Sequence, residues 1–383
     1  MAVVVNSRAN YARIKSLLKS IELRPELKLE LVLGASSLIS RHGNLEAVIM
    51  KDGLTPSARV NTIVEGDSPS AMATSTGLGV IELASLFENM KPDIVLTVAD
   101  RFETLATALA ASYMNIAVAH TQGGELTGSI DESVRHAVTK LSHYHFPATK
   151  KSAERLIAMG ENPDKILMSG CPSLDLVREV ANWDVNTLGH SLPGVGPGID
   201  FDKPYFLVLQ HPVTTEWGNA AEQISGTIEA ISSLGVQSVW LWPNVDAGAD
   251  IFSRELRRAR EGGRLPKVQF VKNLPPEDYL ILLKNCHCII GNSSSAIREA
   301  SFLAVPAVNV GTRQLNRERS SNVVDVGYES NQIIEAIKNL NDARGKIERS
   351  DLYGDGYAGE RIADFLSGPT PHYQKEFYVW QSE

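Results

Sequence analysis

Acidic, basic and imidazole side chains are concentrated in residues 98–145, at the ends of short apolar runs. Asp100 and Arg101 follow the run DIVLTVA, and His120 ends the run NIAVAH. Carboxylates and imidazoles transfer protons, and guanidinium groups bind anions, so such a cluster could perform acid–base chemistry on an anionic substrate. A single acid or histidine in such a place is usually a helix cap or a structural group. The convergence of several such groups favours a functional site.

Parallel strands would position these side chains. The β-branched runs predict strands, and in open parallel sheets ligands bind outside the carboxyl ends of the strands. Two consecutive strand ends then bring together a first set of candidates: Asp100, Arg101, His120, Gln122 and Glu125. The next segment, SIDESVRHAV, predicts a helix with capping-box spacing between Ser129 and Glu132. Its first turns, with Asp131 and Arg135, would face the same crevice.

The second half contains an apolar run that ends in serines, CIIGNSSSAIREA. We expect Ser293 and Ser294 to open a helix whose free N–H groups bind a diphosphate. Glu299, further along, would accept hydrogen bonds from ribose hydroxyls. In the alternative interpretation, the serines only cap a helix.

Three arginines, Arg313, Arg317 and Arg319, follow the next predicted strand and suit phosphate geometry. In the alternative interpretation they lie on a solvated face.

Three further strand ends point to the same cleft. His211 follows the run YFLVLQ, and Pro212 restricts it towards extended geometry. Asn244 follows QSVWLW, and Arg8 follows the first strand, where it could reach a phosphate.

Composition narrows the class of protein. The chain has 383 residues, 43% hydrophobic and 21% charged, with a net charge of −8. These values indicate a globular protein of two domains and argue against a nucleic-acid partner. We expect no membrane partner, because no apolar stretch is expected to reach the roughly 20 residues that span a bilayer. Cys171, Cys286 and Cys288 lack metal-ligand spacing, and we expect no metal, a reducing compartment and a cytoplasmic location.

The order of predicted elements indicates an α/β fold. Strand-like and helical runs alternate, and a Gly/Pro-rich stretch, SLPGVGPGIDFDKP, interrupts them once. We therefore predict two Rossmann-like, doubly wound domains facing a central cleft. Residues 1–172 would form the first domain, which a C-terminal helix over 365–383 could complete, and residues 173–364 would form the second. No G-x-G-x-x-G or G-x-x-x-x-G-K-[ST] motif occurs, so neither a tightly held dinucleotide nor NTP hydrolysis is indicated.

Taken together, these motifs resemble the UDP-N-acetylglucosamine 2-epimerase family, specifically its hydrolysing branch, which supplies N-acetylmannosamine for sialic acid synthesis. The resemblance covers nearly the whole chain and rests on these landmarks: SRANYARI, ADRFETLA, HTQGGELTGSIDESVRHAVTKLSHYHF, SGCPSLD, LQHPVTTEW, PNVDAG, GNSSSAIREA and GTRQLNRE. It implies a GT-B-like fold, a homodimer and no cofactor.

The resemblance also implies roles. Hydrolysing members eliminate UDP to give a 2-acetamidoglucal and then add water with inversion at carbon two. Asp100 and Asp131 match the family's catalytic carboxylates, and His211 matches its catalytic histidine. The positions that hold UDP are matched by Arg8, Arg101, Asn244, Ser293, Ser294, Glu299 and Arg313.

One position departs from the family pattern. Two residues after His120, family members carry a third catalytic glutamate, and this chain has Gln122. An amide cannot accept a proton as a carboxylate does. Either Glu125 takes the role, or Gln122 only positions substrate or water, or the enzyme is impaired.

Several functions stay open. The substrate is UDP-N-acetylglucosamine or a UDP- or GDP-linked N,N'-diacetylbacillosamine of the legionaminic acid pathway, which the landmarks do not distinguish. Other candidates are a non-hydrolysing 2-epimerase, a GT-B glycosyltransferase, and a binding or regulatory module without catalysis.

Overall fold

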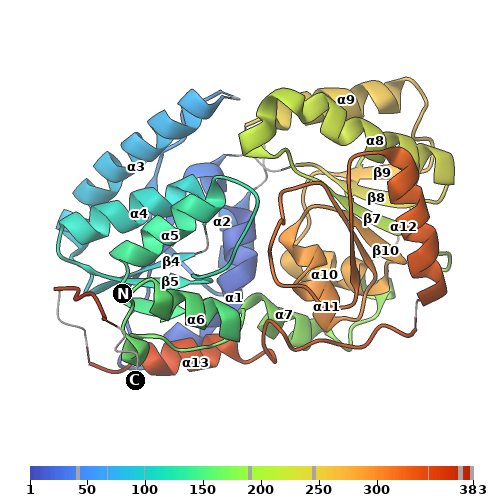
Figure 1. The fold of residues 1–383 in the computed structure, drawn as a ribbon. Helices are drawn as coiled ribbons and strands as arrows, with labels where there is room; N and C mark the ends of the chain where they lie inside the picture. Colours follow the sequence, from blue (N-terminus) through green and yellow to red (C-terminus); the bar gives the residue numbers. More distant parts are fainter. Residues whose placement is uncertain are drawn as a thin grey trace.

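Two parallel sheets with helices on both faces make up the protein, as predicted (Figure 1). The computed structural model describes residues 1–39, 44–66, 68–98, 100–188, 192–243, 247–343, 345–369 and 374–379. The predicted site residue Asn244 lies outside these ranges.

The first sheet has the strand order β3-β2-β1-β4-β5-β6. Its strands are β1 (Ala2–Val5), β2 (Glu30–Gly34), β3 (Pro56–Val60), β4 (Ile94–Val98), β5 (Ala117–Thr121) and β6 (Tyr144–Phe146). The central strands are apolar and buried on both faces, as a covered parallel sheet requires. The helices of this half are α1 (Arg8–Glu22), α2 (Leu45–Lys51), α3 (Pro69–Met90), α4 (Phe102–Tyr113), α5 (Asp131–Leu141) and α6 (Lys150–Ala158). Helices α1 and α2 share one hydrophobic core with the sheet, while α3, α4 and α5 share another.

The second sheet has the order β12-β11-β10-β7-β8-β9. Its strands are β7 (Phe206–Leu209), β8 (Ser238–Leu241), β9 (Val268–Val271), β10 (Cys288–Gly291), β11 (Ala307–Val310) and β12 (Val323–Val326). Its helices are α7 (Ser173–Val180), α8 (Ala220–Leu234), α9 (Ala249–Glu261), α10 (Pro276–Asn285), α11 (Glu299–Phe302) and α12 (Ser330–Ala343). Helices α8, α9 and α12 cover one face of this sheet, and α7, α10 and α11 contribute to the core on the other. In both sheets the order reverses between the first and fourth strands, so each half has a switch point at which ligands bind.

The chain passes between the two halves twice, and the two passages touch. The backbone N–H of Cys171 donates to Tyr353 O at 2.7 Å. A Cβ added to Gly354 would lie 2.9 Å from the Cα of Gly170, so these glycines permit the close approach. We propose the domain boundary at residues 172 and 173.

The C-terminal helix lies earlier than the predicted range 365–383. Helix α13 spans Ala358–Leu366 and packs on α1, with Ile362 and Ala363 in the core of the first half. The chain therefore returns to the first half at its C-terminal end (Figure 1).

One helix of the described residues, α3, is long and apolar enough to cross a membrane by length and composition, with a mean hydropathy of 1.2. The expectation that no stretch reaches this length was wrong. Helix α3 packs along α4 through Gly79, Leu83 and Phe87. A Cβ added to Gly79 would lie 2.9 Å from the Cβ of Ala106, so the two helices approach closely, as packed helices of a globular domain do.

Residues 374–379 return to the outer edge of the first half, where Glu161 is buried among cations. Its carboxylate accepts hydrogen bonds from Lys140 at 2.7 Å and pairs with Lys375 at 2.5 Å and His145 at 2.9 Å. Burial alone would raise the Glu161 pKa, but His145, Lys140 and Lys375 lower it from 4.5 to about 2.

Glu161 is therefore expected to contribute to acid stability. A carboxyl whose pKa is depressed in the folded state stabilises the fold above its unfolded pKa, and this contribution disappears as the pH falls from about 4.5 to about 2. We expect it to reach roughly 3 kcal/mol. The Glu161→Gln variant should lose stability at pH 7 and show a flatter dependence of unfolding free energy between pH 5 and 2 in urea titrations. Parallel curves for the two proteins would contradict the assignment.

Candidate active site

The switch points of the two sheets face one another. On the first half, Arg8 begins α1 after β1, and Asp100 and Arg101 follow β4. On the second half, His211 follows β7, and Ser293 follows β10. Because β1 pairs with β4 and β7 pairs with β10, each pair of strand ends delivers its side chains to one crevice.

A cavity of about 220 Å³ lies between the halves. The sequence-predicted residues that line it are Arg8, His211, Ser293, Ser294, Glu299 and Arg313. Through shared lining residues such as Arg8 and Trp242 it adjoins a larger cavity of about 880 Å³, which Arg101 also lines. Guanidinium groups from both halves, together with serine hydroxyls and an imidazole from the second half, suit a ligand with phosphates.

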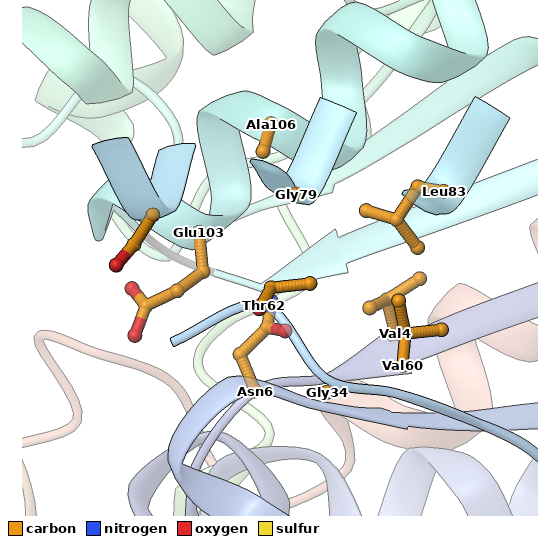
Figure 2. Close-up of a pocket in the computed structure, with 10 residues that line it drawn as sticks. Val4, Asn6, Gly34, Val60, Thr62, Gly79, Leu83, Glu103 and Ala106 are labelled. Carbon is orange, nitrogen blue, oxygen red and sulfur yellow. The ribbon is translucent and has the colours of Figure 1, made fainter. Parts of the chain in front are cut away.

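A third hollow is too small for a substrate. Figure 2 shows Asn6, Thr62 and Glu103 around it, between the strand ends of the first sheet and helices α3 and α4. Its volume is about 10 Å³, which is room for one water molecule at most. The Glu103 carboxylate accepts from Arg101 at 3.2 Å, so this side of the crevice orients Arg101.

Asp100 lies in a buried cluster of opposite charges. Arg135 of α5 donates to its Oδ2, and Arg317 of the second half lies 3.8 Å from the same oxygen. Burial alone would raise the Asp100 pKa, but Arg135, Arg13 and Arg317 outweigh it and hold the pKa well below its usual range. Asp100 is therefore ionised at neutral pH.

Glu125 is the second carboxylate of this cluster. Its Oε2 accepts from Arg298 at 2.5 Å and lies 3.2 Å from Arg317, both on the second half. Arg135 donates to the backbone carbonyl of Glu125 at 2.7 Å. Burial opposes ionisation, but Arg298, Arg317 and Arg135 lower the pKa of Glu125. Two guanidinium groups of the second half converge on one oxygen of Glu125, so the geometry favours an anchoring role for this residue.

Gln122 follows β5 directly and is buried. Its backbone has φ 63°, its N–H donates to Phe146 O at 2.9 Å, and its side-chain Nε2 lies 3.0 Å from the Sγ of Cys171. His120, in β5, is also fully buried. Neither residue lines the two cavities between the halves, and the same holds for Asp100, Glu125, Asp131 and Arg135.

Restoring a carboxylate at position 122 is expected not to help. In Gln122→Glu the side chain loses its N–H donor to Cys171 and brings a carboxyl into a fully buried place, which should cost about 1–3 kcal/mol of stability. We expect a lower melting temperature and no gain in kcat. An increase in kcat of tenfold or more would show instead that a missing base limits the wild-type enzyme.

Asp131 begins α5 and faces the second half. Its Oδ2 lies 3.9 Å from Arg313 Nη2, so a carboxylate of one half meets a guanidinium group of the other. The predicted capping box is formed differently. Ser129 Oγ accepts from Asp131 N at 3.3 Å, while the Glu132 carboxylate accepts from Thr127 N at 2.7 Å instead of reaching Ser129.

The loop that precedes Asp131 touches the second half through its backbone. Gly128 N–H donates to Arg313 O at 3.1 Å. A Cβ added to Gly128 would lie 1.9 Å from the carbonyl oxygen of Thr312, so only glycine allows this approach.

The backbone of Ser293–Ser295 differs from the predicted helix start. They form a short 3-10 turn, Ser294–Ala296, and the following helix α11 has only four residues, so there is no long helix whose N-terminus could bind the phosphates. The groups at the cavity that could bind phosphates are instead serine hydroxyls and arginine side chains. Arg13 of α1 donates to Ser294 Oγ at 3.0 Å, and Ser293 and Ser295 share a hydrogen bond of 2.9 Å.

Glu299 lines the same cavity. Its Oε2 is buried and has no hydrogen-bond partner among the described residues. This oxygen is available to accept hydrogen bonds from a ligand hydroxyl.

Two of the three arginines expected at a phosphate lie elsewhere. Arg317 faces Glu125 and Asp100, and Arg319 pairs with Asp325. Of these three arginines, only Arg313 lines the cavity. It donates to the Asn292 carbonyl at 3.2 Å.

Several contributing residues were missed. Asn292 accepts from His211 N at 2.7 Å and donates to His211 O at 2.8 Å, which fixes the histidine backbone. Arg13 and Arg298 were missed because each contacts a residue far away in the sequence. The only signal in the sequence is that they lie inside the motifs SRANYARI and GNSSSAIREA. In the described residues, no group of three or more potential metal ligands lies together.

Comparison with known proteins decides the family. The family model described as UDP-N-acetylglucosamine 2-epimerase matches residues 19–367. The chain belongs to this family. It is an epimerase of the UDP-N-acetylglucosamine 2-epimerase family with two Rossmann-like domains, as the sequence motifs indicated.

Three similar proteins illustrate the relationship. The epimerase is 34% identical to a Legionella pneumophila protein named UDP-N,N'-diacetylbacillosamine 2-epimerase (hydrolyzing), over 97% of this chain and 96% of that protein. It is 30% identical to a Neisseria meningitidis UDP-N-acetylglucosamine 2-epimerase, over 96% of this chain and 94% of that one. A crystal structure of UDP-GlcNAc 2-epimerase from Neisseria meningitidis bound to UDP-GlcNAc shares the fold, with a TM-score of 0.78, 19% identity and coverage of 95% and 98%.

Proposed function

We propose that this epimerase is a hydrolysing 2-epimerase, which releases UDP from a UDP-linked 2-acetamido sugar and adds water to the resulting glycal. The observation that carries the proposal is the meeting of Asp131 with Arg313 across the cleft, 3.9 Å apart, beside the serines of the second half. This contact puts a carboxylate next to the groups suited to a diphosphate.

The roles follow from the contacts. Arg8, Arg13, Arg313, Ser293 and Ser294 would bind the diphosphate, and Glu299 would accept hydrogen bonds from the ribose. His211, held by Asn292, would donate a proton to the leaving group. Asp100 and Asp131 would move the proton at carbon two and direct water to the glycal. Gln122, buried away from the cavities, would position the loop.

The substrate has two candidates. UDP-N-acetylglucosamine is the sugar nucleotide in the description of the family. The name of the Legionella relative favours a 2,4-diacetamido sugar. The chemistry at carbons one and two is the same for both.

Product analysis tests the proposal. Purified enzyme is incubated with each nucleotide sugar, and UDP and sugars are separated by anion exchange and identified by NMR. We expect free UDP in equal amount to a free 2-epimeric sugar. Accumulation of the UDP-linked 2-epimer would identify a non-hydrolysing enzyme, and no conversion of either substrate would reject the proposal.

We also propose a cytoplasmic homodimer. The described cysteines, Cys171, Cys286 and Cys288, are buried free thiols, which fits a reducing compartment. The dimer rests on family resemblance, and light scattering of the purified protein at micromolar concentration tests it.

A further inference from the structure

We propose that Arg317 is a positioning residue of the second half, which reaches the first half and holds Asp100 in place, with Glu125 as its anchor. The inference rests on the proposed function and extends it. It adds a residue that does not line the substrate cavity to the machinery of proton transfer.

The geometry of Arg317 supports this role. It lies between β11 and β12 of the second half, and its side chain is buried. Its Nη2 lies 3.2 Å from Glu125 Oε2 and 3.8 Å from Asp100 Oδ2, and both carboxylates belong to the first half. One nitrogen therefore faces two carboxylates of the opposite half.

The charges around Asp100 come from both halves. Arg135 on α5 and Arg13 on α1 belong to the first half, as Asp100 does. Arg317 comes from the second half. The next groups outward are Glu125, Arg298, the Arg101–Glu103 pair on the side of α4, Tyr353 and the Cys171 thiol.

Glu125 explains how Arg317 is kept in this position. Burial lowers the pKa of Arg317 to about 10, and repulsion from Arg298 and Arg135 acts in the same direction. The attraction of Glu125 opposes both effects. Glu125 bonds Arg298 at 2.5 Å and thereby offsets the repulsion at the point where the halves meet. Two guanidinium groups of the second half therefore meet at Glu125, and one of them also faces Asp100.

The consequence concerns the state of Asp100. Burial alone would raise its pKa, and Arg317 is one of three arginines that outweigh burial. When Arg317 is removed, Asp100 should require a higher pH to ionise and should be held less firmly. The remaining arginines, Arg135 and Arg13, keep it partly in place.

The pH dependence of turnover tests the inference in the full-length enzyme. In Arg317→Met we expect the acid limb of kcat to move to higher pH and kcat at its optimum to fall about 10- to 100-fold, because a small misplacement of a reacting group is costly. KM should change much less, since Arg317 does not line the substrate cavity. Arg317→Lys, which keeps the charge, should restore the acid limb in part.

The control removes a guanidinium group elsewhere on the same half. Arg258 on α9 is exposed and pairs with Glu255 within its own helix, so Arg258→Met should have the wild-type pH profile. Circular dichroism confirms that each variant is folded.

The outcomes separate the inference from the proposed function. If the wild-type enzyme releases UDP and Arg317→Met keeps the wild-type acid limb and kcat, the inference is wrong and the function stands. If the wild-type enzyme converts neither sugar, the proposed function fails. The titration of Asp100 is then followed by NMR of ¹³C-labelled aspartate, with Asp100→Asn for assignment, and an identical midpoint in wild type and Arg317→Met overturns the inference.

Discussion

Replacing Asp100 with asparagine is expected to lower turnover by roughly 10²- to 10⁴-fold, the range that a positioned acid–base group contributes. Asparagine has nearly the same shape but cannot accept a proton. Affinity for UDP should change little, because the serines and Arg313, which line the cavity on the second half, are untouched. UDP release gives the rate, and calorimetric titration with UDP gives the affinity.

Asp100→Asn also leaves Arg135 without its charge partner, so stability must be measured together with activity. A folded variant that binds UDP and does not turn over supports the assignment. Asp364→Asn is the matched control, since Asp364 is exposed and pairs with Arg24 on the far side of α1. Turnover of Asp100→Asn within a factor of a few of the control would refute the catalytic role.

Replacing Glu125 with glutamine is expected to destabilise the protein by about 3–5 kcal/mol, the cost of breaking a buried ion pair by removing one partner. Arg298 is almost fully buried, and its Nε and Nη1 have no hydrogen-bond partners among the described residues. Without Glu125, both Arg298 and Arg317 keep a buried charge with no anchor. Chemical denaturation with a fluorescence readout measures the loss.

The same experiment includes a surface comparison. Glu46 forms an exposed pair with Arg59, and Glu46→Gln should leave the denaturation midpoint unchanged because exposed pairs contribute little. If Glu125→Gln is as stable as Glu46→Gln, the buried cluster does not hold the halves together.

The fold was largely predictable because central parallel strands are continuous apolar runs. The edge strands β3 and β12 were not named in advance, since Pro56–Val60 and Val323–Val326 are partly exposed and mix polar with apolar residues. The apolar run KILMSG is typical of a strand, but Ile166 only forms a bridge with His145. In the run CHCIIGN, Cys286 follows the end of α10, and the strand β10 begins only at Cys288. Short apolar runs do not by themselves distinguish a strand from a loop that crosses the sheet edge.

The site was predictable to the extent that its residues follow strands. Asp100, His211 and Ser293 were found from that position alone. The contacts between them were not predictable, because Glu125 meets Arg298 across 173 residues of chain. The sequence also cannot tell that Arg317 faces two carboxylates and not a phosphate, since a guanidinium group suits both.

Gly128 lies so close to Thr312 that a single methyl group added to it would not fit between the two halves. An alanine at position 128 would collide with the Thr312 carbonyl and separate the two halves at this point, without changing any side chain of the crevice. Comparing UDP binding with turnover in such a protein would show which of the two depends on the contact between the halves.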